Sequence, residues 1–326
     1  MKTIKSLFQK LNSKDFLNTK IVALFFFTLL TFSCSQDIDD NQQIDLNNQF
    51  REIIKDQYKA PNGIIYYTGC NSCTSDGSYS FDSNNVLSDL EILDDLPEEY
   101  DLSHYLPPIG DQGRQGSCVS WASTYYLKSM QKRIEASPPY NLSTIMSPAY
   151  TYNQITEGIC EGTPINSALE ILKEKGTTPL QIFPYFDNTC SIQPTEEQDE
   201  MAIDNKIDDY KYLSGENMVL EMKTLIVEET PILISAFLTS EFAKTDDLGL
   251  TAYRDHIIDF SIPGGCHAML VVGYSDTHNA FKVVNSWGED WGDDGFVWID
   301  YAAFDNVLNE EASFKVISTA LIANDL

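Results

Sequence analysis

The spacing of apolar residues along the chain changes near residue 230. Before this point they recur at the three- and four-residue intervals of a helix with one buried face, as over residues 117–134. Beyond it, short apolar runs rich in β-branched and aromatic residues predict strands: PILISAF (231–237), CHAMLVVGYS (266–275), AFKVVNSW (280–287) and GFVWIDY (295–301). A helix-rich front half and a strand-rich back half predict an α+β protein with two lobes and a cleft between them.

Turn and stop signals bound the other predicted elements. Pro138 and Pro139 end the helix that starts at Ser117, and further helices are predicted over residues 164–176 and 216–228. Turn-forming pairs within residues 62–81 predict a short hairpin or an extended segment there. At 326 residues the chain is long enough to bury a large core.

The composition is strongly acidic. Lys and Arg number 21 against 49 Asp and Glu, which gives a formal net charge of −28. Such a surface repels nucleic acid and anionic membrane and favours solubility. We therefore expect no nucleic-acid partner, and we interpret most of the charge as a solvated exterior.

The first 34 residues have the pattern of a targeting segment. A lysine-containing region precedes the apolar run IVALFFFTLLTF (21–32), which is shorter than the roughly 20 residues that span a bilayer. We expect a signal peptide over residues 1–33, followed by an acidic tether or pro-segment over 34–95. The ending LTFSC resembles the cleavage box of Gram-negative bacterial lipoproteins, which implies lipidation of Cys34. The expected location is the bacterial cell envelope, anchored at the outer membrane and facing the periplasm or the outside.

Cys118 follows the turn-forming stretch DQGRQGS and begins a predicted helix, which Ser117 is placed to cap. Unpaired backbone N–H groups and the helix dipole stabilise a thiolate at such a position, and the thiolate is the nucleophilic form. A buried structural thiol and one half of a disulfide are the alternatives. A catalytic cysteine also needs a histidine base and a group that orients it.

One histidine has a context that suits this role. His267 lies at the start of a predicted strand, just after two glycines, and Asn285 ends a later strand in the sequence NSWG. The Asn285 amide can fix the tautomer of the imidazole, while the indole of Trp287 shields that hydrogen bond from water. A strand-end histidine and a packed aromatic turn are the structural alternatives, but their joint occurrence after Cys118 favours a catalytic set.

In this order and context, these motifs resemble those of the papain-like cysteine peptidases, which include the cathepsins. The resemblance covers roughly residues 96–321. It implies a papain-like peptidase domain over 96–326, with a helical N-terminal lobe (about 96–215) and an antiparallel, β-barrel-like C-terminal lobe (about 216–326). It implies that Cys118 is the nucleophile, His267 the general base and acid, and Asn285 the orienting residue. Gln112 takes the oxyanion-hole role with the Cys118 backbone N–H, and Trp287 covers the His–Asn bond.

The stretch CEGTPI (160–165) resembles the family's substrate-pairing segment. By that alignment the substrate-binding residues are Gly162, Thr163, Pro164, Ile165 and Ala268. Three of them, Pro164, Ile165 and Ala268, wall the main specificity pocket, which implies an apolar residue two positions before the scissile bond. The resemblance implies no cofactor and no metal, a peptide or protein substrate, and a monomer.

The sequence also departs from the family pattern. Val119 stands where the family has tryptophan directly after the nucleophile, and Gln115 stands where it has a half-cystine. Cys160 thereby lacks its usual partner, and Cys190 is the best candidate for a disulfide with it. Residues 35–95 contain no long helical pro-domain. We interpret Cys266 as a packed thiol, with a bridge to Cys118 or to the Cys70/Cys73 pair as the alternative.

Two other classes of function compete with the peptidase. The first is a peptide-binding lipoprotein that is catalytically inactive on a papain-like scaffold. The second is a metal site built from Cys70, Cys73, Cys266 and His267, for which the sequence offers no second CxxC and no spaced histidine pair. The intact set of Gln112, Cys118, His267 and Asn285 favours the peptidase.

Overall fold

The computed structural model describes residues 56–60, 62–74, 78–254, 258, 265–305, 307 and 315–325. The predicted signal peptide, Cys34 and the first part of the predicted tether, residues 35–55, lie outside these residues. None of the helices in the described part of the chain combines the length and apolar character needed to cross a bilayer.

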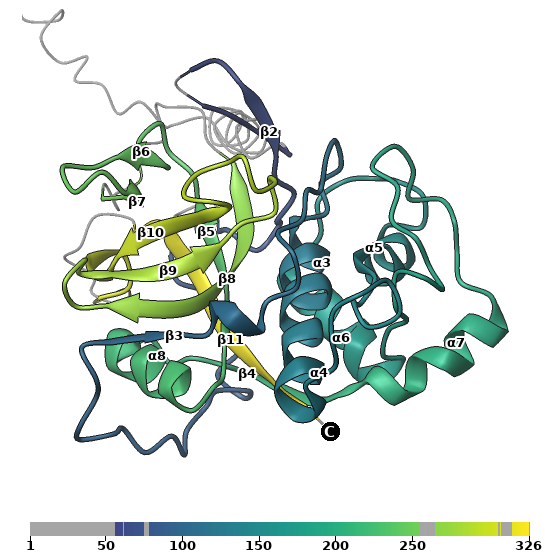
Figure 1. Ribbon diagram of the computed structural model, residues 1–326, viewed down its shortest axis with the longest axis horizontal. Coiled ribbons are helices and arrows are strands. Elements are labelled where there is room, and N and C mark those ends of the chain that lie inside the picture. Colours follow the sequence, from purple (N-terminus) through teal and green to yellow (C-terminus); the bar gives the residue numbers. More distant parts are fainter. Residues whose placement is uncertain are drawn as a thin grey trace, which may run out of the picture. The chain divides into compact units, whose positions relative to one another are not determined.

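A mostly antiparallel sheet of nine strands forms one lobe (Figure 1). Its longest strand, β8, is buried throughout and pairs with β5 and β3 along one edge and with β9 along the other. The strands are β3 (Glu99–Asp101), β4 (Ile207–Tyr212), β5 (Ile232–Phe237), β6 (Lys244–Thr245), β7 (Thr251–Tyr253), β8 (Cys266–Ser275), β9 (Ala280–Val284), β10 (Phe296–Asp300) and β11 (Ile317–Asp325). The path along the sheet is β4-β11-β5-β8-β9-β10-β7-β6, and the β10–β7 pair is parallel.

One continuous helix separates the sheet from the second lobe (Figure 1). It consists of α3 (Cys118–Ser120), the π-helical η2 (Trp121–Lys128) and α4 (Ser129–Ala136), and Ser137 ends it in a left-handed conformation before Pro138. All residues from Cys118 to Gln131 are buried, because both lobes pack against this helix. The predicted helix is thus confirmed, and its N-terminal end faces the junction of the lobes.

The other helices pack mainly on the far side of this central helix. They are α5 (Pro148–Thr156), α6 (Ile165–Glu174) and α7 (Glu196–Ala202), whereas α8 (Met218–Val227) covers the sheet beside β3. Thr195 and Gln198 form a reciprocal capping box at the start of α7. Short 3-10 turns complete the set: η1 (Ser103–Tyr105), η3 (Ile203–Asn205) and η4 (Tyr301–Ala303).

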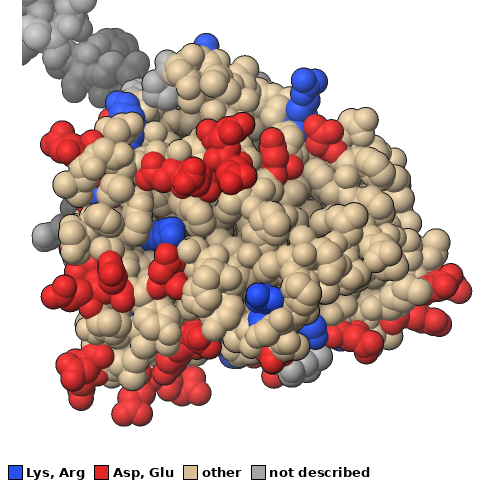
Figure 2. All heavy atoms as spheres, viewed as in Figure 1, with Lys and Arg blue, Asp and Glu red and all other residues tan. Residues whose placement is uncertain are grey.

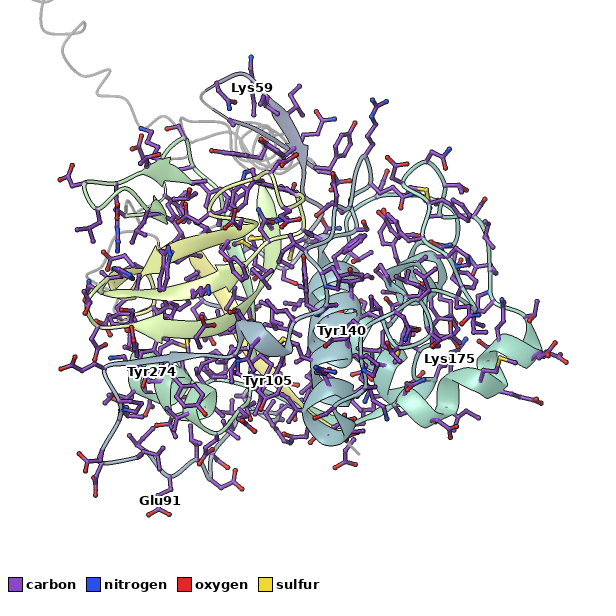
Figure 3. All side chains as sticks on the ribbon, in the orientation of Figure 1. Lys59, Glu91, Tyr105, Tyr140, Lys175 and Tyr274 are labelled. Atoms are coloured by element: carbon purple, nitrogen blue, oxygen red, sulfur yellow. A yellow bond between two sulfur atoms is a disulfide. The ribbon has the colours of Figure 1, made fainter. Side chains whose placement is uncertain are left out.

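The chain crosses between the lobes more often than the sequence predicts. The expected division near residue 215 places β3 and β4 in the helical lobe, but both strands belong to the sheet. Tyr140 links the turn after β3 to the central helix, because the carbonyls of Tyr105 and Ser129 share its single hydroxyl proton at 2.5 and 3.1 Å (Figure 3). The α+β, two-lobe, papain-like architecture itself is confirmed.

A two-stranded hairpin precedes the lobes in sequence. It pairs β1 (Gln57–Lys59) with β2 (Ile65–Tyr67), as the turn signals of this region predict. The chain then continues from β2 into the junction of the two lobes, where Cys70 is buried. We call residues 65–73 the cleft segment.

The acidic excess is visible on the surface. Figure 2 shows acidic side chains in several groups across one face, whereas the basic side chains on that face are fewer and scattered. This distribution agrees with a solvated acidic exterior.

Candidate active site

Cys118 is the first residue of α3 and is completely buried at the junction of the lobes. It is a free cysteine, and its Sγ accepts a hydrogen bond of 3.4 Å from the backbone N–H of Ala268 on β8. The expected cap is wrong: the Ser117 hydroxyl makes no capping bond to the helix and lies 2.7 Å from the Tyr185 hydroxyl instead. The side chains of Cys118 and Ser117 are thus contacted from both lobes.

His267 and Asn285 are brought together by neighbouring strands. The pairing of β8 with β9 places the start of β8 beside the residue that follows β9, and His267 Nε2 lies 2.7 Å from Asn285 Oδ1. The indole of Trp287 stacks on the imidazole with ring centroids 4.7 Å apart. His267 Nδ1 is left without a hydrogen-bond partner. The predicted histidine, amide and indole therefore form one cluster.

Gln112 is held in a fixed orientation below this cluster. Its Oε1 accepts a 2.6 Å hydrogen bond from the Ser286 hydroxyl, so its Nε2 points the other way, toward the cleft segment. Its backbone carbonyl accepts a 2.7 Å hydrogen bond from the hydroxyl of Tyr185. Sequence reasoning missed Ser286 and Tyr185. The serine within NSWG was an available signal for the first, whereas nothing near Tyr185 in the sequence pointed to the second.

Tyr126 connects the central helix to both sides of the site. Its hydroxyl donates to the Asn285 carbonyl at 2.9 Å and accepts from the Gly110 N–H at 3.0 Å. The side chain is buried, so these bonds are shielded from water. One hydroxyl thus links the backbone of the orienting amide to the turn that carries Gln112.

The cleft segment lies directly across these residues. Trp287 Nε1 donates to the Tyr67 carbonyl at 2.7 Å, and Gln112 Nε2 donates to the Thr68 carbonyl at 3.0 Å. Further along, the Thr163 N–H donates to the Gly69 carbonyl at 2.9 Å and the Asn71 N–H donates to the Thr163 carbonyl at 3.0 Å. This is a parallel β-bridge centred on Cys70 and Thr163. The segment therefore occupies the cleft as an extended chain.

Burial under this segment changes the ionisation of the site. Desolvation raises the pKa of the Cys118 thiol well above its ordinary value, with the neighbouring Cys70 adding to the effect. Desolvation also lowers the pKa of His267 to about 4, against the opposing hydrogen bond to Asn285. The expectation of an activated thiolate is wrong for this state, because the cleft segment excludes the water that would stabilise the charged forms.

Three of the five predicted substrate-binding residues, Gly162, Thr163 and Ile165, form hydrogen bonds with the cleft segment, whereas the Ala268 N–H bonds to Cys118. The Gly162 carbonyl accepts from Asn71 Nδ2 at 2.5 Å, and the Ile165 N–H donates to the Ser72 hydroxyl at 2.7 Å at the start of α6. Thr163, Ile165 and Ala268 are buried, whereas Pro164 is exposed. The structure thus brings this set to the same cleft.

Both disulfides of the described chain lie near the cleft. Cys160 pairs with Cys190, as predicted. Cys266 pairs with Cys73, so the interpretation of Cys266 as a packed thiol is wrong. The extended cleft segment, which the sequence alone did not place, brings Cys73 beside β8. Cys73 and Cys266 are also two of the four ligands that the alternative metal site requires, and this disulfide joins them to each other.

Val119 and Gln115 are the two positions where the sequence departs from the family pattern, and the structure shows what surrounds each of them. Val119 is fully buried, and Trp121 packs its ring against Tyr125 and Tyr185 with centroids 4.5 and 5.0 Å apart. Gln115 Nε2 donates to the Phe186 carbonyl at 2.9 Å, which links the loop before Cys118 to the helical lobe by a hydrogen bond.

Comparisons with known proteins agree with this geometry. Cathepsin B-like CP2 of Giardia intestinalis is 25% identical over 241 residues, which are 67% of this chain and 74% of that protein. A cysteine proteinase of Theileria annulata is 27% identical over 274 residues, which are 77% of this chain and 57% of that protein. The solved structure of xylellain, a cysteine protease from Xylella fastidiosa, shares the fold, with a TM-score of 0.62 and 20% identity over 79% of this chain and 97% of that one. The family model described as "Papain family cysteine protease" matches residues 96–316, and the chain therefore belongs to this family of cysteine-type peptidases.

Proposed function

We propose that the chain hydrolyses peptide bonds with Cys118 as nucleophile and His267 as general base and acid. The 2.7 Å contact between His267 Nε2 and Asn285 Oδ1 supports this, because it leaves Nδ1 as the imidazole nitrogen available for the thiol proton. Attack of the Cys118 sulfur on the substrate carbonyl forms a thioester and releases an amine that His267 protonates. Water activated by His267 then hydrolyses the thioester and frees Cys118.

The oxyanion of each tetrahedral intermediate is stabilised by the Gln112 amide and the Cys118 backbone N–H. The observation that carries this proposal is the 3.0 Å hydrogen bond from Gln112 Nε2 to the carbonyl of Thr68. A carbonyl of an extended chain already accepts a hydrogen bond from this amide in the cleft that holds Cys118. A substrate carbonyl placed there would meet a donor that Ser286 has already oriented.

The backbone of Thr163 is proposed to bind the substrate as an extended strand. Its N–H and carbonyl both pair with the cleft segment, which supports a β-type mode of peptide recognition. Ala268 and Ile165, both buried, are proposed to form the apolar pocket together with Pro164. We therefore expect an apolar residue two positions before the scissile bond, and preference for arginine there in a positional-scanning library would contradict this.

Export and lipid anchoring at Cys34 remain part of the proposal. They are supported by the apolar run over residues 21–32, by the LTFSC ending and by two disulfides, which persist in oxidising compartments. Mass spectrometry of the protein isolated from cells is expected to find a lipidated N-terminal Cys34 and a monomer. An unmodified N-terminus would contradict the anchor without affecting the proposed chemistry.

The test of the peptidase uses full-length protein under reducing conditions. Wild type is expected to be labelled by an activity-based epoxide probe and to cleave a broad peptide library, whereas Cys118→Ser should do neither. Cys70→Ser is the matched control, because Cys70 is the other free, buried cysteine in the described chain. If protein with an alkylatable Cys118 cleaves nothing in the library, the inactive binding lipoprotein is favoured instead.

A further inference from the structure

The cleft segment is joined covalently to the site it covers. Cys73 forms a disulfide with Cys266, the residue directly before His267, across 193 residues of sequence. We propose that this disulfide is a redox-sensitive latch, and that its reduction by a dithiol allows the cleft segment to leave Cys118. The inference rests on the proposed function for its biological meaning, but the latch itself concerns only access to Cys118.

Contacts along the cleft segment show how completely it covers the site. With it in place, Cys118 and His267 are both 0% exposed. Trp287, Gln112 and Thr163 each donate a hydrogen bond to a carbonyl of the segment, as described above. A substrate carbonyl cannot reach the Gln112 amide while Thr68 occupies it. The segment must therefore move before any extended peptide can bind.

The disulfide lies at the inner end of the segment, where it limits that movement. Only four residues lie between Thr68 and Cys73, and the Cys70 N–H also donates to the Cys266 carbonyl at 3.2 Å. If the chain were cut after Cys73, the piece that contains residues 65–73 would still be attached beside His267. Such a cleavage therefore cannot by itself clear the cleft.

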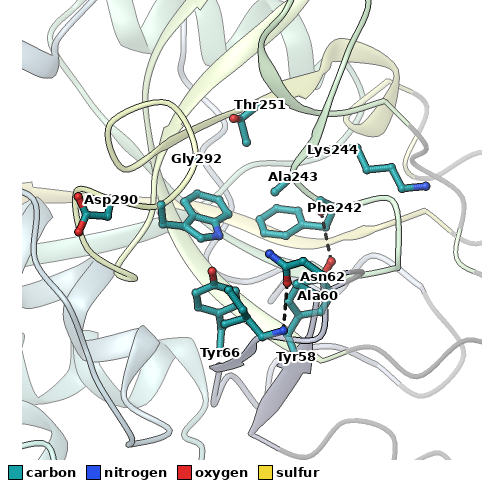
Figure 4. A pocket seen from close by; sticks show the side chains of 12 residues that line it. Tyr58, Ala60, Asn62, Tyr66, Phe242, Ala243, Lys244, Thr251, Asp290 and Gly292 are labelled. Atoms are coloured by element: carbon teal, nitrogen blue, oxygen red, sulfur yellow. Dashed lines mark hydrogen bonds between the residues drawn. The ribbon is translucent and has the colours of Figure 1, made fainter.

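The outer end of the same region is held by noncovalent contacts. The hairpin leaves a pocket of about 450 Å³ between itself and the sheet lobe, lined by Tyr58, Tyr66, Phe242 and Asp290 among others (Figure 4). Ile64 and Ile65 on the hairpin are about half exposed, at 50% and 52%. The contacts of the hairpin, including the stacking of Tyr58 and Tyr66 on Trp287, are noncovalent, whereas the disulfide at the inner end is covalent and must be broken chemically.

The two cysteines of this disulfide differ in exposure. Cys73 is partly exposed, whereas Cys266 is 1% exposed. A dithiol therefore attacks Cys73 Sγ, which forms a mixed disulfide and expels Cys266 as a thiolate that takes up a proton. The second thiol of the reductant then displaces Cys73, so that the reductant leaves as its own disulfide and both protein cysteines are thiols.

Cys70 is an internal competitor for this exchange. Its thiol could attack Cys73 to form a Cys70–Cys73 bond and free Cys266, with no net oxidation or reduction. Burial raises the pKa of Cys70 to about 11, which keeps its thiolate scarce at neutral pH and makes this route slow. A Cys70→Ser variant is therefore expected to keep the latch and its response to reductant.

The test measures alkylation of Cys118 by iodoacetamide in full-length oxidised protein, followed by peptide mass spectrometry. The double variant Cys73→Ser/Cys266→Ser is expected to be alkylated at least about thirtyfold faster than wild type. A disulfide commonly shifts the equilibrium toward the closed state by a factor of about this size. Wild type that is reduced briefly and freed of reductant should match the variant. The control is Cys160→Ser/Cys190→Ser, which removes the other disulfide and should stay slow.

The outcomes separate the latch from the peptidase. Equal alkylation rates in oxidised wild type, reduced wild type and the Cys73→Ser/Cys266→Ser variant would overturn the latch, whatever the peptidase assay shows. Fast alkylation on opening without cleavage of any peptide would support the latch and refute the proposed function. Circular dichroism identifies a variant that fails to fold, and in that case the comparison of oxidised with reduced wild type decides the matter.

Discussion

Gly69 of the cleft segment lies so close to Gly116 that a Cβ on Gly69 would be 2.2 Å from the Gly116 carbonyl oxygen. Gly69 also has a φ of +114°, which side chains rarely permit. Gly69→Ala should therefore push the segment out of the cleft. In reduced protein we expect Cys118 to be alkylated at least about tenfold faster in this variant than in wild type, since overpacking against fixed backbone costs about 1–3 kcal/mol.

Gly63→Ala is the matched control for that experiment. Gly63 also has a positive φ, of +87°, but no atom lies within 4 Å of the position its Cβ would take. This variant strains the hairpin without pressing on the cleft, so its alkylation rate should stay near that of wild type. If the two variants behaved alike, strain in the segment rather than close packing against Gly116 would control opening.

Ser286 should matter for the rate through the orientation it gives Gln112. Ser286→Ala removes the hydroxyl that donates to Gln112 Oε1 and leaves a buried acceptor without that partner. We expect kcat for peptide hydrolysis under reducing conditions to fall about tenfold with KM nearly unchanged, because the amide acts mainly in the transition state.

A serine elsewhere provides the control for this effect. Ser147 is equally buried and donates a 2.5 Å hydrogen bond to the Phe183 carbonyl in the helical lobe. Ser147→Ala should lower the free energy of unfolding by a similar amount, about 1 kcal/mol, and leave kcat unchanged. Equal losses of kcat in both variants would show that Ser286 contributes stability alone.

Much of the fold followed from local patterns in the sequence. The apolar spacing over residues 117–134 predicted the central helix, and the runs after residue 230 predicted β5, β8, β9 and β10. The C-terminal strand β11 was missed, although it lies between β4 and β5 in the sheet. Its pairing joins residues far apart in sequence, and such non-local contacts leave little trace in a local pattern.

The site was predictable to the extent that its residues stand in recognisable motifs. The sequence identified the histidine and the amide that the structure brings together, and also the Cys160–Cys190 pair. It did not identify the cleft segment or its bond to Cys266, because an extended chain that binds through backbone groups has no periodicity of its own. The protonation states of Cys118 and His267 were missed for the same reason, since they depend on the segment that covers Cys118.

The Cys160–Cys190 disulfide should stabilise the helical lobe without regulating access. The two cysteines are 30 residues apart in sequence, and the loop that they close contains Gly162 and Thr163. Replacing both cysteines with serine should lower the free energy of unfolding by about 3 kcal/mol, measured by urea denaturation of oxidised protein. An unchanged midpoint would mean that the loop is already fixed by its hydrogen bonds.

His267 should make the closed, oxidised protein sensitive to acid. Its pKa is lowered by burial from 6.5 to about 4 in the folded state, so the unfolded chain takes up the proton first as the pH falls. The free energy of unfolding is therefore unaffected by this histidine above pH 6.5, and it decreases as the pH falls from 6.5 toward 4. At pH 5 the loss amounts to about 2 kcal/mol.

Urea denaturation at pH 7.5 and pH 5.0 measures this loss. Wild type should lose about 2 kcal/mol more than His267→Gln between the two pH values, since the variant has no imidazole to protonate. The raised pKa of the partly buried Asp56 acts in the opposite direction, but this residue is present in both proteins and its effect cancels in the difference. His104→Gln, which replaces an exposed histidine, should behave as wild type. An equal loss in wild type and His267→Gln would show that the imidazole is not held neutral beneath the cleft segment.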